Sequence, residues 1–202
     1  TFTGIQSVGA LTKQQANTVK LTGANTSTGA ITVSAGVLQV GDAGTTGEIT
    51  GNASVATGAS LVFSRSDAAS YAGAISGAGT VSKLGTNTLT LTGLQTYTGA
   101  TATGSSGGGM VFTNNTRPST PSFTGNGFVT IQPAAAGSFA SAFATSAYSF
   151  ANTLTGLTFG RDGNTATMTV DSVLNIAGPI SIYGGTINLN ADITSTAANA
   201  AM

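Results

Sequence analysis

The chain contains no cysteine, no histidine and no tryptophan, and only 6% of its 202 residues are charged. A typical soluble domain carries about 25% charged residues. Without histidine or cysteine, the usual zinc and haem sites, cysteine nucleophiles and Ser-His-Asp triads are excluded. Six basic residues balance six acidic ones, so the chain lacks the excess of positive charge that is typical of nucleic-acid-binding proteins. We therefore expect a protein that is not an enzyme and that has no cofactor, metal ion or nucleic-acid partner.

Long apolar runs are also missing. None approaches the roughly 20 residues of a membrane-spanning helix. The sequence opens at Thr1 without a charged segment ahead of an apolar one, so we expect that a signal peptide was removed or that the chain is an excerpt. The lack of cysteine fits either a reducing compartment or export through a narrow pore without disulfides. Thr, Ala, Gly and Ser make up 117 residues, yet 40% of the chain is hydrophobic, which favours a folded protein.

Two distant segments of the chain repeat one another. Segment 9–33, GALTKQQANTVKLTGANTSTGAITV, aligns without a gap with segment 79–103, GTVSKLGTNTLTLTGLQTYTGATAT. Eleven of the 25 positions are identical. The pairing of Lys13 with Lys83 is informative because lysine is scarce in this chain. We interpret the two segments as copies of one structural unit.

A shorter period lies in apolar pairs spaced i, i+2, which place both side chains on one face of a strand. Near the C-terminus the pairs start 6 to 7 residues apart: Met168/Val170, Leu174/Ile176, Ile180/Ile182 and Ile187/Leu189. Such short strands predict an all-β fold, a right-handed parallel β-helix (β-solenoid) with three short faces per rung of about 19 residues. Some ten rungs, each rising about 4.8 Å, would form a rod of about 45–50 Å. We expect Leu91, Leu174, Ile182 and Leu189 to point into its core.

Two stretches interrupt the pattern. Segment 104–121 holds a glycine run and two prolines and predicts a loop or junction. Segment 134–150 places Phe139 and Phe143 at helical spacing, which fits a short helix or an irregular loop. The expected organisation is therefore β-solenoid repeats in 1–104, a Gly/Pro junction in 105–125, and a second solenoid segment in 126–202.

The repeats resemble the autotransporter-associated β-strand repeat of bacterial passenger domains. The resemblance rests on KLG at 83–85, TLTLTG at 88–93 and TYTG at 96–99. The first copy departs from the pattern at Gln15, where glycine is expected, and at Ser27, where tyrosine is expected.

The C-terminal segment from Leu154 to Gly185 is similar to large secreted exoproteins of the filamentous-haemagglutinin type. Both resemblances imply an extracellular or cell-surface bacterial protein, exported by type V secretion and either anchored at the outer membrane or released. They imply an adhesin or a structural stalk or fibre that serves surface attachment or a biofilm.

Candidate catalytic residues are few and scattered. The six acids are far apart in sequence and give no paired-carboxylate signature: Asp42, Glu48, Asp67, Asp162, Asp171 and Asp192. Arg65 with Asp67, and Arg161 with Asp162, favour turns with surface ion pairs rather than sites. Too few acids surround 162–164 for calcium, and no Gly-Lys-Ser/Thr follows the glycine run at 104–109 as a phosphate loop requires.

The remaining patterns allow alternatives to adhesion. Thr88, Thr90 and Thr92 alternate with leucines, and a second row occupies 165–169, so an ice-binding face is one hypothesis. Outward threonine is also a good strand former in any solenoid. The tyrosines Tyr71, Tyr97 and Tyr183 are more often stacked core aromatics than a sugar-binding platform.

We expect recognition, if present, to come from loops such as 104–125 and 134–150. The expected partners are flanking repeats of the same chain or further copies stacked end to end, which would make the chain a self-assembling filament or matrix subunit.

Overall fold

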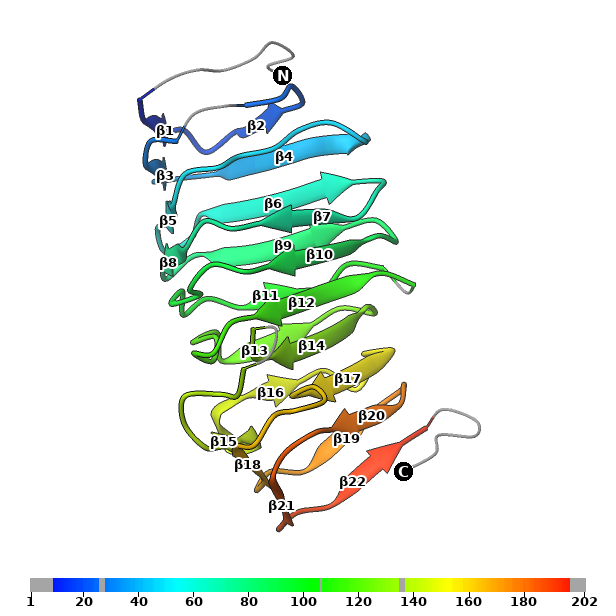
Figure 1. The fold of residues 1–202 in the computed structure, drawn as a ribbon. Coiled ribbons are helices and arrows are strands. Elements are labelled where there is room, and N and C mark those ends of the chain that lie inside the picture. The colour runs from blue at the N-terminus through cyan, green and yellow to red at the C-terminus, as the bar shows by residue number, and fades with distance from the viewer. Residues whose placement is uncertain (1–8, 26–27, 106, 135–136, 197–202) are drawn as a thin grey trace.

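The fold was analysed in a computed structural model that describes residues 9–25, 28–105, 107–134 and 137–196. Parallel strands stack into a β-solenoid of about nine turns, with the N-terminal turns at one end of the rod and the C-terminal turns at the other (Figure 1). The expected all-β parallel solenoid is therefore confirmed.

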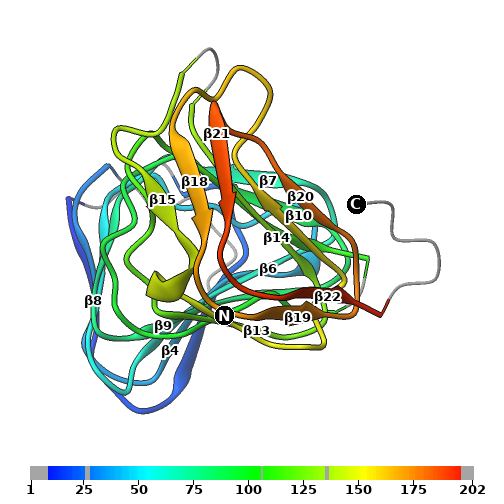
Figure 2. The same cartoon turned by 90° about the horizontal axis from the view of Figure 1, so that it is seen from below.

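Three sheets form the sides of the coil (Figure 2). Side one contains β1 (Leu11–Lys13), β3 (Ile31–Val33), β5 (Ala53–Val55) and β8 (Ile75–Gly77). Side two contains β2 (Thr18–Leu21), β4 (Val37–Gly44), β6 (Ser60–Arg65), β9 (Thr80–Leu84), β11 (Thr101–Ala102), β13 (Ser122–Thr124) and β16 (Ser149–Phe150). Side three contains β7 (Ala69–Tyr71), β10 (Thr88–Leu91), β12 (Gly109–Thr113), β14 (Phe128–Gln132), β17 (Gly156–Phe159) and β20 (Ile180–Ile182).

Two smaller sheets continue the coil toward the C-terminal end. One is made of β15 (Phe143–Ala144), β18 (Thr167–Val170) and β21 (Thr186–Leu189), and the other of β19 (Leu174–Ile176) and β22 (Ile193–Ser195). The strands β15, β18 and β21 each come directly after a strand of side three in the chain. They resemble in this respect β8 of side one, which comes directly after β7.

The core is built from side chains that stack in register from turn to turn. On side three Leu89 pairs with Met110, Met110 with Val129, and Val129 with Leu157, and all four side chains are buried. The residues between them alternate outward because successive side chains of a strand point to opposite faces. The i, i+2 apolar pairs of the sequence thus correspond to the inward rows of the coil.

The predicted core positions agree with the structure except at the last described turn. Leu91 and Leu174 are 0% and 1% exposed, and Ile182 is half-buried. Leu189 is 62% exposed, so the prediction of a buried Leu189 was wrong. It lies on β21, beyond which the structure describes no further turn that would cover it.

The turns are less uniform in length than the sequence pattern predicts. On side three Val111 pairs with Thr130, whereas Ile131 pairs with Phe159, which is much further along the sequence. Side one also loses its regular pairing after β8, where Ile75 forms only an isolated bridge with Gln95. The longer turns contain irregular segments on side one.

The stretch expected to be a Gly/Pro junction, 105–125, is partly regular. It contains β12 and β13, and β12 pairs with β10 on one side and with β14 on the other. Interpreting this stretch as a loop was therefore wrong for 109–113 and for 122–124, because Met110, Phe112 and Phe123 fill inward positions of paired strands. The division into two solenoid segments around it stays a prediction.

The phenylalanine-rich stretch 134–150 forms neither an α-helix nor a wholly irregular loop. Its described part contains β15, a single 3₁₀ turn over Thr145–Ala147, and β16. Phe139 and Phe143 are both buried, with ring centroids 5.5 Å apart. Their spacing reflects burial in a common aromatic cluster rather than one face of a helix.

The two sequence repeats lie on different sides of the coil. β1 and β2 of the first copy lie on sides one and two, whereas β9 and β10 of the second copy lie on sides two and three. The offset between the copies therefore corresponds to a whole number of turns plus one side. The repeat cannot build one continuous outer surface, because its two copies face different directions.

A column of glycines marks one corner of the coil. A Cβ added to Gly29 would lie 1.0 Å from the carbonyl oxygen of Gly9, and one added to Gly51 would lie 1.8 Å from that of Gly29. Gly93 meets the oxygen of Gly73 in the same way, at 2.2 Å. Successive turns thus approach more closely at this corner than any side chain permits.

Candidate functional site

The features shared by the two sequence repeats point into the protein. Lys13 and Lys83 are 4% and 1% exposed. Each ammonium group donates a hydrogen bond to the carbonyl oxygen two residues later, Lys13 to Gln15 and Lys83 to Gly85, the latter at 2.7 Å. The same interaction survives although Gln15 replaces the expected glycine.

A second shared feature involves the amide side chains of Asn25 and Gln95, which occupy equivalent positions in the two copies. Asn25 Nδ2 donates to the carbonyl oxygen of Gly23 at 3.1 Å, and Gln95 Nε2 donates to that of Gly93 at 2.9 Å. Both side chains are buried. The repeat therefore encodes interior hydrogen bonds from side chains to nearby backbone carbonyl groups. These bonds are the same in both copies, although the copies lie on different sides of the coil.

The interior lysine predicts a pH dependence of stability. Burial lowers the pKa of Lys83 below the ordinary lysine value. The folded protein therefore releases this proton at a lower pH than the unfolded chain, so the free energy of unfolding should rise with pH up to about 10.4. We expect the wild type to gain stability relative to Lys83→Met between pH 8 and pH 10, measured by urea unfolding.

The comparison with Lys83→Met isolates this effect. Burial raises the pKa of Tyr148 to about 12 and raises those of Tyr71 and Tyr97 further, which acts in the opposite direction above pH 10. Both variants share these tyrosines, so their contribution cancels in the difference. A difference that stays flat with pH would show that Lys83 keeps its ordinary pKa in the folded state.

Of the two predicted surface ion pairs, the structure contains one. Arg65 Nη2 lies 2.8 Å from Asp67 Oδ2. In the described part of the chain Arg161 and Asp162 form no ion pair, so that prediction was wrong. The turn itself is present, because Asn164 donates its backbone N–H to the carbonyl of Arg161 at 3.1 Å.

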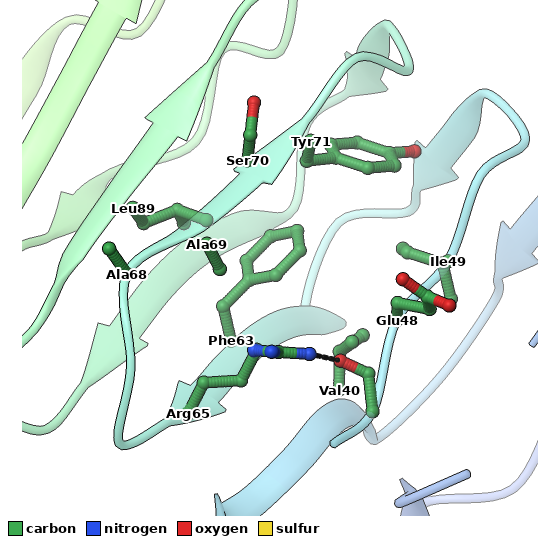
Figure 3. Close-up of a pocket in the computed structure, with 11 residues that line it drawn as sticks. Val40, Glu48, Ile49, Phe63, Arg65, Ala68, Ala69, Ser70, Tyr71 and Leu89 are labelled. Carbon is green, nitrogen blue, oxygen red and sulfur yellow. Dashed lines mark hydrogen bonds between the residues drawn. The ribbon is translucent and has the colours of Figure 1, made fainter. Parts of the chain in front are cut away.

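Arg65 also bridges two turns beside a cavity (Figure 3). Its Nη1 donates to the carbonyl oxygen of Gly47 at 2.9 Å, and its Nη2 donates to that of Thr45 at 2.5 Å. β7 is the outermost strand of side three, and the preceding segment 47–49 does not pair with it. A cavity of about 160 Å³ lies between that segment and β7.

This cavity offers little for chemistry. The guanidinium group of Arg65 is committed to Asp67 and to two carbonyl oxygens, which leaves it no bidentate face for an anion. The inner wall is apolar and includes Val40, Phe63 and Leu89. We interpret the cavity as a local separation of turns that Arg65 stabilises.

The loops that sequence analysis selected for recognition meet on side one. Segment 116–119 and residues Ala140, Ser141, Ala147 and Tyr148 line a shared cavity of about 310 Å³. The two loops are tied together: Tyr148 donates its hydroxyl to the carbonyl of Pro118 at 3.0 Å, and Ala140 donates its N–H to that of Asn115 at 2.9 Å. The cavity is therefore part of the folded coil and does not depend on loop closure.

Arg117 is the charged residue of this cavity. Its guanidinium carbon lies 5.6 Å from the ring centroid of Phe143. Arg117 is half-buried and makes no hydrogen bond or ion pair with the described residues. Sequence analysis missed it, although a signal was present: Arg117 is the only charged residue between Lys83 and Arg161.

The acidic residues Asp42 and Asp171 make structural contacts. Within the described residues no group of three or more His, Cys, Asp or Glu side chains could hold a metal ion. Asp42 pairs with Lys20 at 2.6 Å, and Asp171 accepts hydrogen bonds from Ser146 and Thr145. These donors lower the pKa of the Asp171 carboxyl, so it is suited to fastening the 3₁₀ turn rather than to donating a proton.

Asn164, weighed and rejected as part of a calcium site, is a buried structural residue. Its Oδ1 accepts from Ser138 Oγ at 2.8 Å, and its Nδ2 donates to the carbonyl oxygen of Tyr183 at 2.8 Å. It thereby links three successive turns. With both ends of its amide committed to the protein, Asn164 has a structural role.

The structure also shows where the tyrosines and the threonine rows lie. Tyr71 and Tyr97 are buried, as expected of core aromatics, whereas Tyr183 is 44% exposed. Thr90 lies in an outward column with Ser70, Val111 and Thr130. Val111 interrupts this column of hydroxyl side chains. The adjacent outward column contains Thr88, Gly109 and Phe128, so the two columns do not form the repeated double row of threonines that an ice-binding face requires.

Comparison with known families now identifies the repeated units. The family model of the passenger-associated-transport-repeat matches residues 11–40 and 81–102. Both repeated segments resemble this repeat. This confirms the resemblance to autotransporter passengers, and the repeat family implies a secreted or cell-surface bacterial protein. No curated protein and no solved structure matches the chain.

The segments that match the repeat and the loops expected to carry recognition occupy different parts of the molecule. The repeats contribute interior lysines, amides and corner glycines, whereas the cavity at Arg117 lies outside both matched segments. Among the described residues no helix is long and apolar enough to cross a membrane.

Proposed function

We propose that this chain is a non-catalytic, surface-displayed passenger segment that acts as an adhesin on a structural stalk. The observation that carries the proposal is the meeting of two irregular loops on side one, which form a lined cavity on an otherwise repetitive coil. Loops on a rigid scaffold are where recognition residues concentrate. The stacked turns supply length and rigidity, and the loops supply the contact surface.

An adhesion assay tests the proposal. Beads coated with the chain are expected to adhere to surfaces coated with bacterial matrix or host-cell polysaccharide. Ser141→Trp should reduce adhesion by filling the exposed rim of the cavity, whereas Ser54→Trp, on the exposed outer face of β5, should not. Equal adhesion of both variants would contradict a role for the loops.

The absence of catalysis is a separate part of the proposal. It is supported by the engagement of Asp42, Asp67 and Asp171 in structural contacts, which leaves no paired carboxylates among these residues. We expect no cleavage of polysaccharides or esters by the purified chain. Activity that disappears in Asp171→Ala would overturn this expectation.

A filament or matrix subunit is the second candidate, and the last described turn favours it. Ile187 and Leu189 on β21 are 45% and 62% exposed, and among the described strands β21 pairs on one side only. With a net charge of zero, copies of the chain would not repel one another. Sedimentation should then show concentration-dependent association that Leu189→Lys abolishes, whereas a monodisperse monomer at high concentration would exclude it.

A further inference from the structure

The cavity at Arg117 carries an inference that goes beyond adhesion in general. We infer that this cavity binds the carboxylate group of an acidic sugar residue, such as a uronic acid. The inference rests on the proposed function insofar as it places ligand recognition in these loops. It adds the chemical class of the ligand and the residue that selects it.

The donors of the Arg117 guanidinium group are free of partners among the described residues. The guanidinium carbon of Arg117 lies 5.6 Å from the ring centroid of Phe143, and Arg117 has no hydrogen-bonding or ionic partner among the described residues. In Arg65, by contrast, Asp67 and two carbonyl oxygens occupy the donors. Arginine presents planar pairs of N–H groups that match a carboxylate in bidentate geometry. The Phe143 ring is within cation–π range of the guanidinium group and attracts it toward this position.

No described carboxylate competes for Arg117. Arg117 is the only charged residue between Lys83 and Arg161, and no described carboxylate forms an ion pair with it. Asp171, which follows β18, is held by hydrogen bonds from Thr145 and Ser146. The positive charge is thus available to an external anion.

The size and the lining of the cavity suit a sugar residue. Its volume of about 310 Å³ lies at the lower end of the range for small-molecule sites, which suits one sugar residue. Thr116, Ser119 and Ser141 are exposed on its rim and offer hydroxyl groups to sugar hydroxyls. One cation surrounded by hydroxyls fits a monovalent carboxylate better than a phosphate dianion.

The walls of the cavity are held in place by hydrogen bonds and by the aromatic core. The hydrogen bond from Tyr148 to Pro118 and the one from Ala140 to Asn115 join the two walls. Beneath them, Phe143 contacts Tyr148 and Phe159 with ring centroids 5.5 and 4.8 Å apart. The walls are therefore fixed by the core of the solenoid, and the cavity does not have to form when the ligand arrives.

Binding of small probes tests the inference. Titration calorimetry or ligand-observed NMR with glucuronate should show millimolar or tighter binding, and glucose, which lacks the carboxylate, should bind at least tenfold more weakly. Arg117→Gln should lower glucuronate affinity at least tenfold, and Arg117→Lys should restore only part of it. Arg161→Gln removes the same charge from another loop and should leave the affinity unchanged.

Several results would overturn the inference. Undetectable glucuronate binding to the wild type would do so, as would equal binding by Arg117→Gln, provided that circular dichroism shows both variants folded. Glucose 6-phosphate binding more tightly than glucuronate would show a phosphate site instead. The proposed function fails separately: it is contradicted if coated beads adhere equally well with Ser141→Trp and Ser54→Trp, whatever glucuronate does.

Discussion

Replacing Phe159 with alanine is expected to lower the free energy of unfolding by about 3–5 kcal/mol. Phe159 is fully buried, and its ring lies 4.8 Å from that of Phe143 and 5.5 Å from that of Phe150. Truncation would leave a cavity between the long turn that ends at β17 and the turn that follows it, and stacked backbones on either side limit how far the cavity can collapse. Urea unfolding followed by circular dichroism measures the change.

Leu189→Ala is the matched control for this prediction. Leu189 belongs to an i, i+2 apolar pair like those of the core, but it is 62% exposed. Its truncation should change the free energy of unfolding by less than about 0.5 kcal/mol. Similar losses in both variants would mean that the last described turn is covered in solution, as stacking of a second copy would cause.

The second large effect is expected at the glycine corner. A Cβ on Gly51 would lie 1.8 Å from the carbonyl oxygen and 2.9 Å from the carbonyl carbon of Gly29, both of which are backbone atoms. The two turns would have to separate, which breaks the hydrogen bonds between β3 and β5. We expect Gly51→Ala to destabilise the protein by about 1–3 kcal/mol or more.

Gly44→Ala provides the control for the corner. Gly44 does not have a positive φ, and an added Cβ would meet no atom within 4 Å. This substitution should be neutral or slightly stabilising because it reduces the freedom of the unfolded chain. Equal midpoints of thermal unfolding for Gly51→Ala and Gly44→Ala would contradict the close approach of the turns at this corner.

Sequence reasoning reached the architecture because the relevant signal is local. The pairs Leu89/Leu91 and Leu174/Ile176 report inward rows directly, since alternation is a property of a single strand. The same reasoning failed at Leu189, because burial there depends on whether another turn lies above the strand. Pattern alone carries no information about such a neighbour.

The orientation of the repeats could not be obtained from the alignment. Lys13 and Lys83 are equivalent in sequence and in their hydrogen bonds, yet they lie on sides one and two. The offset of 70 residues between them is not a whole number of turns. On side one Lys13 pairs with Val33, Val33 with Val55 and Val55 with Gly77, and Lys83 lies on the strand of side two that follows this third turn. The alignment gives only the offset, so the side on which the second copy lies depends on turn lengths that the structure shows.

The candidate site was located only at the level of loops. The sequence selected 104–125 and 134–150 because glycine, proline and irregular spacing interrupt the strand pattern there. Their meeting depends on contacts such as that of Tyr148 with Pro118, which are far apart in the chain and which no local pattern reports. Arg117 became a candidate only when the structure placed it over Phe143 without an acidic partner among the described residues.

The stacking of turns in parallel register is the claim on which the core, the glycine corner and the cavity all depend, and engineered disulfides test it most directly. The chain has no cysteine, so introduced pairs react without background. Thr90 on β10 pairs with Val111 on β12, and Val111 pairs with Thr130 on β14. Adjacent strands lie about 4.8 Å apart, within the Cα separation of a disulfide, whereas strands two turns apart do not. Under mild oxidation Thr90→Cys with Val111→Cys should form a disulfide in the folded protein, and Thr90→Cys with Thr130→Cys should not. Crosslinking of the second pair in preference to the first would contradict the account.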